Sequence, residues 1–291
     1  MTRRPHFSVP LPNGGSLELG GRTLVMAIVN VTPDSFADGG LRFDPDRAIA
    51  DALQMVADGA DLLDIGGEST RPGAAPLPIA DELARVEPVL EGLRGRVDVP
   101  ISIDTYKAAV AERALDLGAA IVNDISALTY DPPLAAVVAR RGAAVILMHN
   151  RGRSSDMYAE AHYADVAGEI ARELAERIAV AAAAGIGRDR IVVDPGLGFA
   201  KRAEHTLEAL ARLPALASSL GLPILSGPSR KSFMKTALGD RPPHERVWGT
   251  AAAVTASVLL GAHIVRVHDV KEMVQVVRVA DAIAAAASSS R

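Results

Sequence analysis

Charged and amide side chains recur in this sequence directly after short runs of apolar residues. Asn30 closes the run Leu-Val-Met-Ala-Ile-Val-Asn, Asp104 closes Ile-Ser-Ile-Asp, and Asp194 closes Ile-Val-Val-Asp. Arg266 and His268 lie at the end of a further run, Ile-Val-Arg-Val-His. A run that is apolar on both faces is typical of a strand buried in a parallel sheet. Polar residues at the ends of several such strands can converge into one site.

The ligand that these residues could bind can be inferred from which of them accept hydrogen bonds and which donate them. Asp104, Asn123 and Asp194 are rich in acceptors, whereas Lys231 and Arg266 can only donate. A flat heterocycle with amino and ring N–H groups on one edge and carbonyl or ring-nitrogen acceptors on another matches this set. A carboxylate accepts a paired N–H edge in the way that it accepts an arginine fork. The residues therefore predict a site for a planar, nitrogen-rich ligand.

An anion, or a metal ion with an anion, is the second ligand that the residues indicate. Asn30, Arg266 and His268 could hold it. Lys231, in Ser-Arg-Lys-Ser, is predicted to open a helix, and a helix N-terminus binds anions through its free N–H groups and its dipole. The alternative interpretation of Arg230 and Lys231 is a solvated turn.

A simpler explanation of all these residues is that strand ends are polar because the chain leaves the core there. It accounts for any single residue, and we favour it for Asp124, His149 and Asp269. It does not explain why so many strand ends carry charged or amide groups. Desolvation at the edge of an apolar core disfavours a carboxylate unless a ligand or partner compensates.

Two loops rich in proline and glycine carry further candidate residues. The loop 32–40 holds Phe36, and the loop 69–78 holds Arg71. An aromatic side chain and an arginine on such loops suggest a lid that closes over an aromatic acid. The competing interpretation is that Phe36 packs against the core. After Asp194, the sequence Pro-Gly-Leu-Gly-Phe predicts a tight turn that lets the backbone approach a ligand.

The elements that must position these residues alternate along the chain as strands and helices. Eight apolar runs of strand type lie at 24–30, 61–65, 99–104, 119–124, 143–149, 190–194, 222–226 and 262–268. Segments of helical period lie at 46–58, 80–93, 106–117, 132–140, 162–184, 204–220, 243–260 and 271–286. Eight such units predict a closed (β/α)8 TIM barrel, which brings all strand ends to one face. A doubly wound open sheet is the alternative, although no glycine-rich dinucleotide or phosphate motif is present.

The length and composition of the chain limit its domain organisation, its partners and the kinds of metal site that it can form. The chain has 291 residues, of which 49% are hydrophobic, so it can bury a large core, and we expect 1–291 to form a single domain. Residues 1–23 contain Asn13-Gly14 and a short alternating segment, which predicts an N-terminal hairpin or arm. The net charge of -4 argues against nucleic acid or membrane as partners. The absence of cysteine excludes thiolate-bound metal, and with no signal peptide evident we expect a cytoplasmic protein.

The motifs taken together resemble those of the dihydropteroate synthases. The matching sequences are Asn-Val-Thr-Pro-Asp-Ser-Phe from residue 30, Asp-Ile-Gly-Gly-Glu-Ser-Thr-Arg-Pro-Gly from residue 64, and Ser-Ile-Asp-Thr from residue 102. They continue with Asn-Asp at 123, Asp-Pro-Gly-Leu-Gly-Phe from 194, Ser-Arg-Lys-Ser from 229, and Arg-Val-His-Asp-Val from 266. The resemblance covers nearly the whole chain and is specific because the motifs occur in the family's order.

The resemblance implies a transferase of folate biosynthesis that condenses 6-hydroxymethyl-7,8-dihydropterin diphosphate with 4-aminobenzoate, giving 7,8-dihydropteroate and pyrophosphate. The implied pterin-binding residues are Asp104, Asn123, Met148, Asp194, Phe199, Lys231 and Arg266. The implied aminobenzoate-binding residues are Phe36, Thr70, Arg71, Pro72 and Ser232. Asn30 would bind the diphosphate through Mg²⁺, and the implied catalytic residues are Asp34, Arg71, Lys231, Arg266 and His268.

The resemblance also implies a homodimer and an ordinary, sulfonamide-sensitive aminobenzoate site. The predicted mechanism is an SN1-like displacement, because loss of pyrophosphate leaves a cation that the pterin ring delocalises. Two alternatives stay open at this point. One is a non-catalytic pterin-binding paralogue, and the other is a relative that transfers a methyl group from a reduced folate, which should lack the two loops at 32–40 and 69–78.

Overall fold

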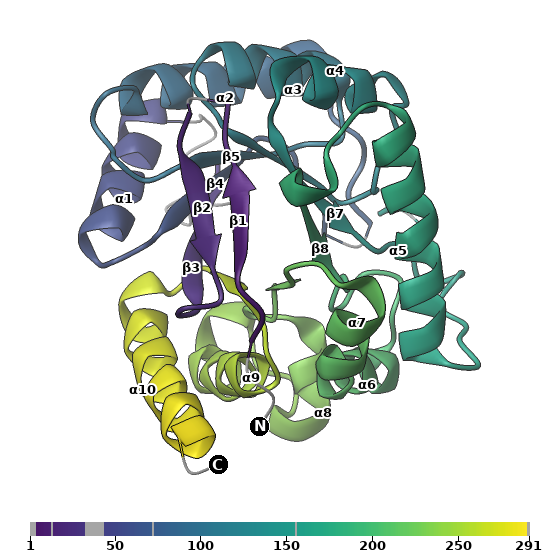
Figure 1. Ribbon diagram of the computed structural model, residues 1–291. Helices are drawn as coiled ribbons and strands as arrows, with labels where there is room; N and C mark the ends of the chain where they lie inside the picture. The colour runs from purple at the N-terminus through teal and green to yellow at the C-terminus, as the bar shows by residue number, and fades with distance from the viewer. Residues whose placement is uncertain (1–3, 13, 33–43, 72, 155, 290–291) are drawn as a thin grey trace.

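The computed structural model describes residues 4–12, 14–32, 44–71, 73–154 and 156–289, and its main feature is one sheet of eight parallel strands (Figure 1). The strands lie in the order β8, β7, β6, β5, β4, β3, β10 and β9. Their bounds are β3 (Leu24–Asn30), β4 (Leu62–Gly66), β5 (Ile101–Asp104), β6 (Ile121–Asp124), β7 (Ala144–Met148), β8 (Ile191–Asp194), β9 (Leu225–Ser226) and β10 (Ile264–Val267). The first and last of these strands also meet, because Val193 bridges Ile224 and donates its N–H to the carbonyl of Pro223 at 3.0 Å. The sheet is therefore the predicted (β/α)8 barrel, and the open-sheet alternative is wrong.

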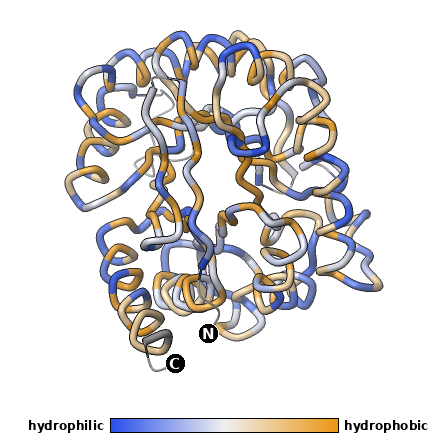
Figure 2. The backbone as a smooth tube through the Cα atoms, viewed as in Figure 1, coloured by the Kyte–Doolittle hydropathy of each residue, from blue (hydrophilic) through white to orange (hydrophobic). Residues whose placement is uncertain are grey.

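Helices surround this barrel and connect successive strands (Figure 1). The α-helices are α1 (Pro45–Ala57), α2 (Ile79–Leu93), α3 (Ala108–Asp116), α4 (Pro133–Arg141), α5 (Val166–Ala183), α6 (Ala203–Ala211), α7 (Leu213–Leu220), α8 (Lys235–Leu238), α9 (Val247–Leu259) and α10 (Val270–Ser289). Short 3₁₀ helices among the described residues are η2 (Arg188–Arg190), η3 (Ser232–Met234) and η4 (Pro243–Glu245). Along the outer helices, polar and apolar residues alternate in Figure 2, as expected of helices that pack one face on the barrel.

Two predicted helices are divided in the structure. The segment 204–220 forms α6 and α7, which meet at Arg212, because Pro214 in the first turn of α7 has no N–H to continue the preceding helix. The segment 243–260 forms η4 and α9. Lys231, predicted to open a helix, precedes only the 3₁₀ turn η3 and the short α8.

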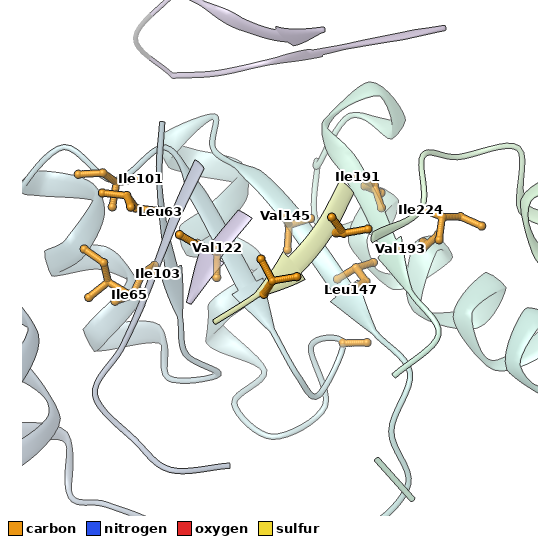
Figure 3. Close-up of a cluster of buried hydrophobic side chains, with 14 of the residues drawn as sticks. Leu63, Ile65, Ile101, Ile103, Val122, Val145, Leu147, Ile191, Val193 and Ile224 are labelled. Carbon is orange, nitrogen blue, oxygen red and sulfur yellow. The ribbon is translucent and has the colours of Figure 1, made fainter. Parts of the chain in front are cut away.

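Side chains alternate between the two faces of the barrel strands. Leu63 and Ile65 of β4 belong to the buried cluster between strands and helices, where they lie with Val145 and Leu147 of β7 (Figure 3). Leu62, one residue before Leu63, belongs instead to a second cluster inside the barrel. This alternation follows from the period of two in an extended strand. It fixes which residues near each strand end face the interior.

The predicted N-terminal hairpin consists of β1 (Phe7–Pro10) and β2 (Ser16–Leu19), paired antiparallel with Phe7 opposite Leu19. Its apolar face covers the end of the barrel at which the strands begin, since Val9 and Leu19 share the interior cluster with Leu24 and Leu62. Figure 1 shows the hairpin lying across the barrel. Among the helices of the described residues, none is long and apolar enough to cross a membrane.

Candidate active site

The alternation of side chains places polar residues inside the barrel at the carboxyl ends of its strands. Leu62 on β4 and Ile121 on β6 face the interior, so Asp64 and Asn123, two residues later, face it as well. Arg266 follows Ile264 on β10 in the same way. The carboxyl-end face of a (β/α)8 barrel is the face on which such enzymes build their sites.

Arg266 is the centre of this polar group. Its Nε donates to Asp64 Oδ2 and its Nη2 donates to Asp104 Oδ2, each at 2.6 Å. Asn123 Nδ2 donates to the same oxygen of Asp64 at 2.8 Å. Burial opposes ionisation of Arg266, but Asp64 and Asp104 outweigh it and raise the pKa of the guanidinium. Four side chains from four strands are thus joined in one network.

Two oxygens of this network have no partner among the described residues, namely Oδ1 of Asp64 and Oδ1 of Asp104. A buried acceptor without a donor is costly. Burial and the charge of Asp64 raise the pKa of Asp104 to about 7, although Arg266 opposes that shift. Asp104 therefore presents an acceptor that a ligand N–H group would satisfy.

The opposite wall comes from β8 and the loop after β9. Asp194 Oδ1 accepts the N–H of Gly196 at 2.7 Å, and burial raises the pKa of this carboxyl. Lys231 Nζ lies 3.9 Å from the centre of the Phe199 ring. Burial and the nearby Arg266 lower the pKa of Lys231 to about 8, so its ammonium form still predominates at neutral pH. This wall offers the carboxyl group of Asp194 as an acceptor and the ammonium group of Lys231 as a donor, beside the aromatic ring of Phe199.

Gly196 shows why the turn after Asp194 needs glycine. Its φ is +66°, and a Cβ atom built there would lie 2.0 Å from the carbonyl oxygen of His149. Only a residue without a side chain allows this approach. The predicted tight turn is confirmed, and it holds Leu197 and Phe199 at the cavity.

The walls line a cavity of about 350 Å³, a volume that includes the space open to solvent at its mouth. It is lined by Thr70, Asp104, Asn123, Ile125, Met148, Asp194, Leu197, Phe199, Gly227, Lys231 and Arg266. All seven residues assigned to pterin binding are in this set, so the structure brings them together, while their role in binding stays a prediction. Sequence reasoning gave no role to Ile125 and Leu197, because an apolar residue after a strand resembles any other core residue. Asp64 also received no role, although it orients both Arg266 and Asn123.

His268 lies beside this cavity and is neutral. Its Nδ1 is 3.0 Å from Ser229 Oγ, and its backbone N–H donates to that same oxygen at 3.2 Å. The hydroxyl hydrogen of Ser229 is therefore free to donate to Nδ1, which leaves the ring hydrogen on Nε2. Burial, followed by the charges of Arg230 and Arg266, lowers the pKa of His268 to about 3. The imidazole can act as a neutral donor through Nε2–H.

The remaining predicted residues are distributed around the mouth of the barrel. Asn30 is half-buried at the end of β3, while Arg71 and Ser232 are exposed. Arg71 is near enough to His268 for its charge to contribute to the lowered pKa of that ring. Asp34, Phe36 and Pro72 lie outside the described residues.

Three strand-end residues that we did not assign to the site each hold segments of the chain together. Asp124 accepts the N–H of Leu128 at 2.6 Å and holds the turn after β6. His149 lies between Lys201 Nζ, at 2.8 Å from its Nδ1, and a carboxylate of α5. Asp269 pairs with Arg230, whose Nε donates to it at 3.0 Å. Arg230 is therefore held by a loop carboxylate and does not line the cavity.

Comparison with known proteins gives one consistent result. The model of the pterin binding enzyme family matches residues 26–268. A dihydropteroate synthase of Synechocystis sp. is 47% identical over 279 residues, which are 96% of either chain. The structure of the Xanthomonas albilineans dihydropteroate synthase with 4-aminobenzoic acid is 43% identical, with a TM-score of 0.87 over 94% of this chain and 98% of that one. The Burkholderia cenocepacia dihydropteroate synthase complexed with 7,8-dihydropteroate is 40% identical, with a TM-score of 0.87 over 99% and 100% of the two chains.

Proposed function

This chain belongs to the dihydropteroate synthase family of pterin-binding transferases, and from that premise we propose the reaction that it catalyses. The chain condenses 6-hydroxymethyl-7,8-dihydropterin diphosphate with 4-aminobenzoate to give 7,8-dihydropteroate and pyrophosphate. The observation that carries this proposal is the cavity, in which an unpaired carboxylate oxygen of Asp104 lies with Asn123, Asp194 and Lys231. A relative with the product bound and another with 4-aminobenzoic acid bound support it.

The pterin fits the arrangement of donors and acceptors in the cavity. Its amino and ring N–H groups would be accepted by Asp104, Asn123 and Asp194, and its carbonyl would accept from Lys231. Met148 and Phe199 supply apolar surface for the flat ring. Among the described residues, the hydrogen bonds of Arg266 use Nε and Nη2, which leaves Nη1 to meet the ligand.

The reaction requires stabilisation of a departing anion. The C–O bond of the pterin methylene breaks, its electron pair leaves with pyrophosphate, and the ring delocalises the resulting cation. The amine nitrogen of 4-aminobenzoate then forms the new C–N bond and loses a proton. Arg266 and the Nε2–H of His268 donate to the leaving group, and their fixed positions reduce the reorganisation needed as charge develops. We therefore favour an SN1-like displacement.

Mg²⁺ is the proposed cofactor, held on the protein side by the amide oxygen of Asn30. Magnesium is commonly bound through one or two protein oxygens together with substrate phosphates. A single amide oxygen at the end of β3 fits that use, and the described residues contain no cluster of acidic and histidine side chains that could hold a metal alone. When bound, the ion would neutralise charge on the diphosphate.

The aminobenzoate site is proposed at the loops of the mouth. Thr70 lines the cavity and Arg71 follows it, so the guanidinium could meet a carboxylate beyond the pterin. Ser232 opens η3 next to Lys231. Phe36, Pro72 and Asp34 would complete the site, and a sulfonamide would compete with 4-aminobenzoate for it.

A cytoplasmic homodimer is the proposed form of the protein, with 1–291 as one domain. Helix α9 contains no charged residue, and Trp248 at its start is 81% exposed. Helix α10 lies beside α9 (Figure 1). It carries Val279 and Ile283, which are also exposed. Burying such a surface against a second copy is favourable. Light scattering after size exclusion should give twice the chain mass, and Trp248→Glu should shift it toward the monomer.

One assay tests the proposed reaction. Purified protein is incubated with the pterin diphosphate, and pyrophosphate is measured with and without 4-aminobenzoate and with and without Mg²⁺. We expect dihydropteroate to form only when both substrates are present. With the pterin diphosphate and Mg²⁺ but no 4-aminobenzoate, we expect slow release of pyrophosphate, as an SN1-like step requires. A non-catalytic pterin-binding paralogue would bind the pterin and release no pyrophosphate. Release that depends strictly on 4-aminobenzoate would contradict the dissociative mechanism but not the reaction.

A further inference from the structure

We propose that Lys107 is a positioning residue for the 4-aminobenzoate half of the reaction. It would act through the loop between β4 and α2, whose residues 68–71 and 73–78 are described. This inference rests on the proposed function, because Thr70 and Arg71 of that loop are the proposed aminobenzoate residues. Lys107 itself touches neither the cavity nor, by the proposal, a substrate.

The ammonium group of Lys107 joins the two ends of this loop. Its Nζ contacts a carboxylate oxygen of Glu68, at the start of the loop, and donates to the carbonyl of Leu77 at 2.6 Å, near the end. It also contacts a carboxylate oxygen of Glu82 on α2. The hydroxyl of Tyr106 donates to the other oxygen of Glu68 at 3.0 Å. The side chain of Lys107 thus fixes Glu68 and Leu77, which are nine positions apart in the sequence.

The cluster is buried, so the desolvation of its charges offsets much of the stability that their attraction contributes. The side chains of Lys107, Glu68 and Glu82 are 8%, 9% and 1% exposed. One carboxylate oxygen of Glu82, Oε1, has no partner among the described residues, and burial raises the pKa of this group. A buried ion pair is often no more stabilising than apolar residues of the same size, so what it contributes is a defined geometry. Here that geometry is the path of the loop.

The same segment connects the loop to the cavity. Asp104, which lines the cavity, is three residues before Lys107, and Lys107 is the N-cap residue directly before α3. The short link 104–107 therefore fixes the loop relative to the carboxylate that would hold the pterin. Other contacts also hold the loop. Arg85 Nη1 donates to the carbonyl of Gly67 and Gly73 N–H donates to the carbonyl of Ser154, both at 2.8 Å, while Ser154 Oγ donates to the carbonyl of Thr70 at 3.5 Å.

A selective kinetic effect follows from this arrangement. The acceptors proposed for the pterin lie at the ends of β5, β6 and β8, and the lysine proposed to donate follows β9, so they do not depend on the path of the loop after β4. Thr70 and Arg71 do depend on it. Loosening the loop should weaken binding of 4-aminobenzoate and leave binding of the pterin diphosphate intact, since misplacement of about 1 Å is enough to lower a rate strongly.

Glu68→Gln and Glu82→Gln provide a matched test. Each removes one negative charge from the same ammonium group and keeps the side-chain shape, but only Glu68 is part of the loop. We expect Glu68→Gln to raise the KM for 4-aminobenzoate roughly 10-fold. Its Kd for the pterin diphosphate, measured by calorimetry, should stay within about twofold of the wild type. Glu82→Gln should change neither constant by more than about twofold.

Thermal unfolding of both variants shows whether they fold, and Glu68→Asp provides a partial rescue because it keeps the charge. Equal effects of the two glutamine variants on the KM would overturn the proposal, and so would a parallel loss of pterin affinity in Glu68→Gln. Failure of the proposed function is distinguishable, because the wild type would then form no dihydropteroate at all.

Discussion

The two ends of the barrel are built on the same strands and have opposite chemistry. On β4, Leu62 and Asp64 both face the interior and are both fully buried, two residues apart. On β10, Ile264 is followed in the same way by Arg266. At the end where the strands begin, the apolar residues meet the hairpin and are covered by Leu19. At the end where the strands finish, charged groups meet a cavity.

The residues that stabilise the fold and the residues that could bind a ligand therefore lie at opposite ends of the same strands. The apolar end is closed, because the hairpin of this chain supplies the partners of its residues. The polar end keeps an unpaired oxygen on Asp104 and a lysine whose pKa is lowered by burial, which are groups that a ligand would complete. Strain and unsatisfied groups are commonly retained at functional sites and offset elsewhere. Substitutions at the two ends should therefore separate activity from stability.

The largest effect is expected from Arg266→Ala at the polar end. Loss of the guanidinium leaves Asp64 and Asp104 buried without their cation, which should lower the free energy of unfolding by about 3–5 kcal/mol. It also removes donors from the proposed leaving-group site, so kcat/KM should fall by about 10³-fold. Urea unfolding and pyrophosphate release measure the two losses.

Arg190→Ala is the matched control at the other end. Arg190 precedes β8 and its Nη1 donates to the carbonyl of Pro10 in the hairpin at 3.4 Å. Its removal should lower stability while kcat/KM of the folded protein stays within about twofold. If Arg190→Ala lost as much activity as Arg266→Ala, the separation of the two ends would not hold.

Leu19→Ala tests the closed end directly and should have the next largest effect. Leu19 is 1% exposed and packs into the apolar interior below the hairpin. Truncation should lower the free energy of unfolding by about 2–5 kcal/mol, because the cavity left behind cannot be refilled by residues held in strands. Steady-state kinetics at 25 °C should be unchanged. A fall in kcat/KM without a change in unfolding would contradict the comparison.

Much of the fold could be predicted from the sequence, because strands buried on both faces are continuously apolar. All eight predicted strands are present, with ends that differ by a few residues. The division of the segment 204–220 at Arg212 was missed, although Pro214 was a visible signal. The helical period on both sides of it is the same, so only the direction of the chain distinguishes one helix from two.

The site was predictable where a residue type was unusual for its position. Asp104 and Asp194 stand out after apolar runs, and the structure brings both to the cavity. Asp64 and Asp124 have the same kind of sequence position, yet Asp64 orients Arg266 while Asp124 holds its own loop. Contacts such as that of Lys107 with residues 68 and 77 depend on side-chain direction and burial, which no local pattern encodes.

Asp104→Asn tests whether the polar end binds the pterin diphosphate at the expense of stability. The amide has the same shape but cannot accept two N–H groups as an anion, so affinity for the pterin diphosphate should fall by about 10–10²-fold. The same substitution should also change how the free energy of unfolding depends on pH. Burial raises the folded pKa of Asp104 to about 7 from its usual 3.8, so the folded state holds the proton more tightly between these values. The free energy of unfolding should therefore fall as pH rises from 3.8 to 7, and this decline should be smaller in Asp104→Asn.

Urea unfolding of the wild type and Asp104→Asn at several pH values between 4 and 8 measures that difference, and calorimetry measures the affinity. An equal pH dependence in both proteins would mean that Arg266 holds Asp104 ionised throughout. Unchanged pterin affinity would instead remove Asp104 from the proposed site.

His263→Gln, at the closed end of the barrel, should have the smallest effect. Its dependence on pH should be opposite to that of Asp104→Asn, because burial lowers the pKa of His263 and raises the pKa of Asp104. The Nδ1 of His263 accepts the N–H of Ile224 at 3.1 Å, and its Nε2 lies 3.2 Å from the carbonyl of Pro5, so the neutral ring satisfies both. Burial lowers its folded pKa to about 4 from 6.5, and the unfolded chain therefore binds the proton more tightly between these values. The free energy of unfolding should fall as pH drops from 6.5 to 4. Glutamine can keep both hydrogen bonds but cannot titrate, so the variant should lose about 1 kcal/mol at pH 7.5 and show a weaker decline in acid. If the free energy of unfolding fell as steeply in acid for His263→Gln as for the wild type, other histidines would be responsible for the decline. The closed end would then have no role in the pH dependence of stability.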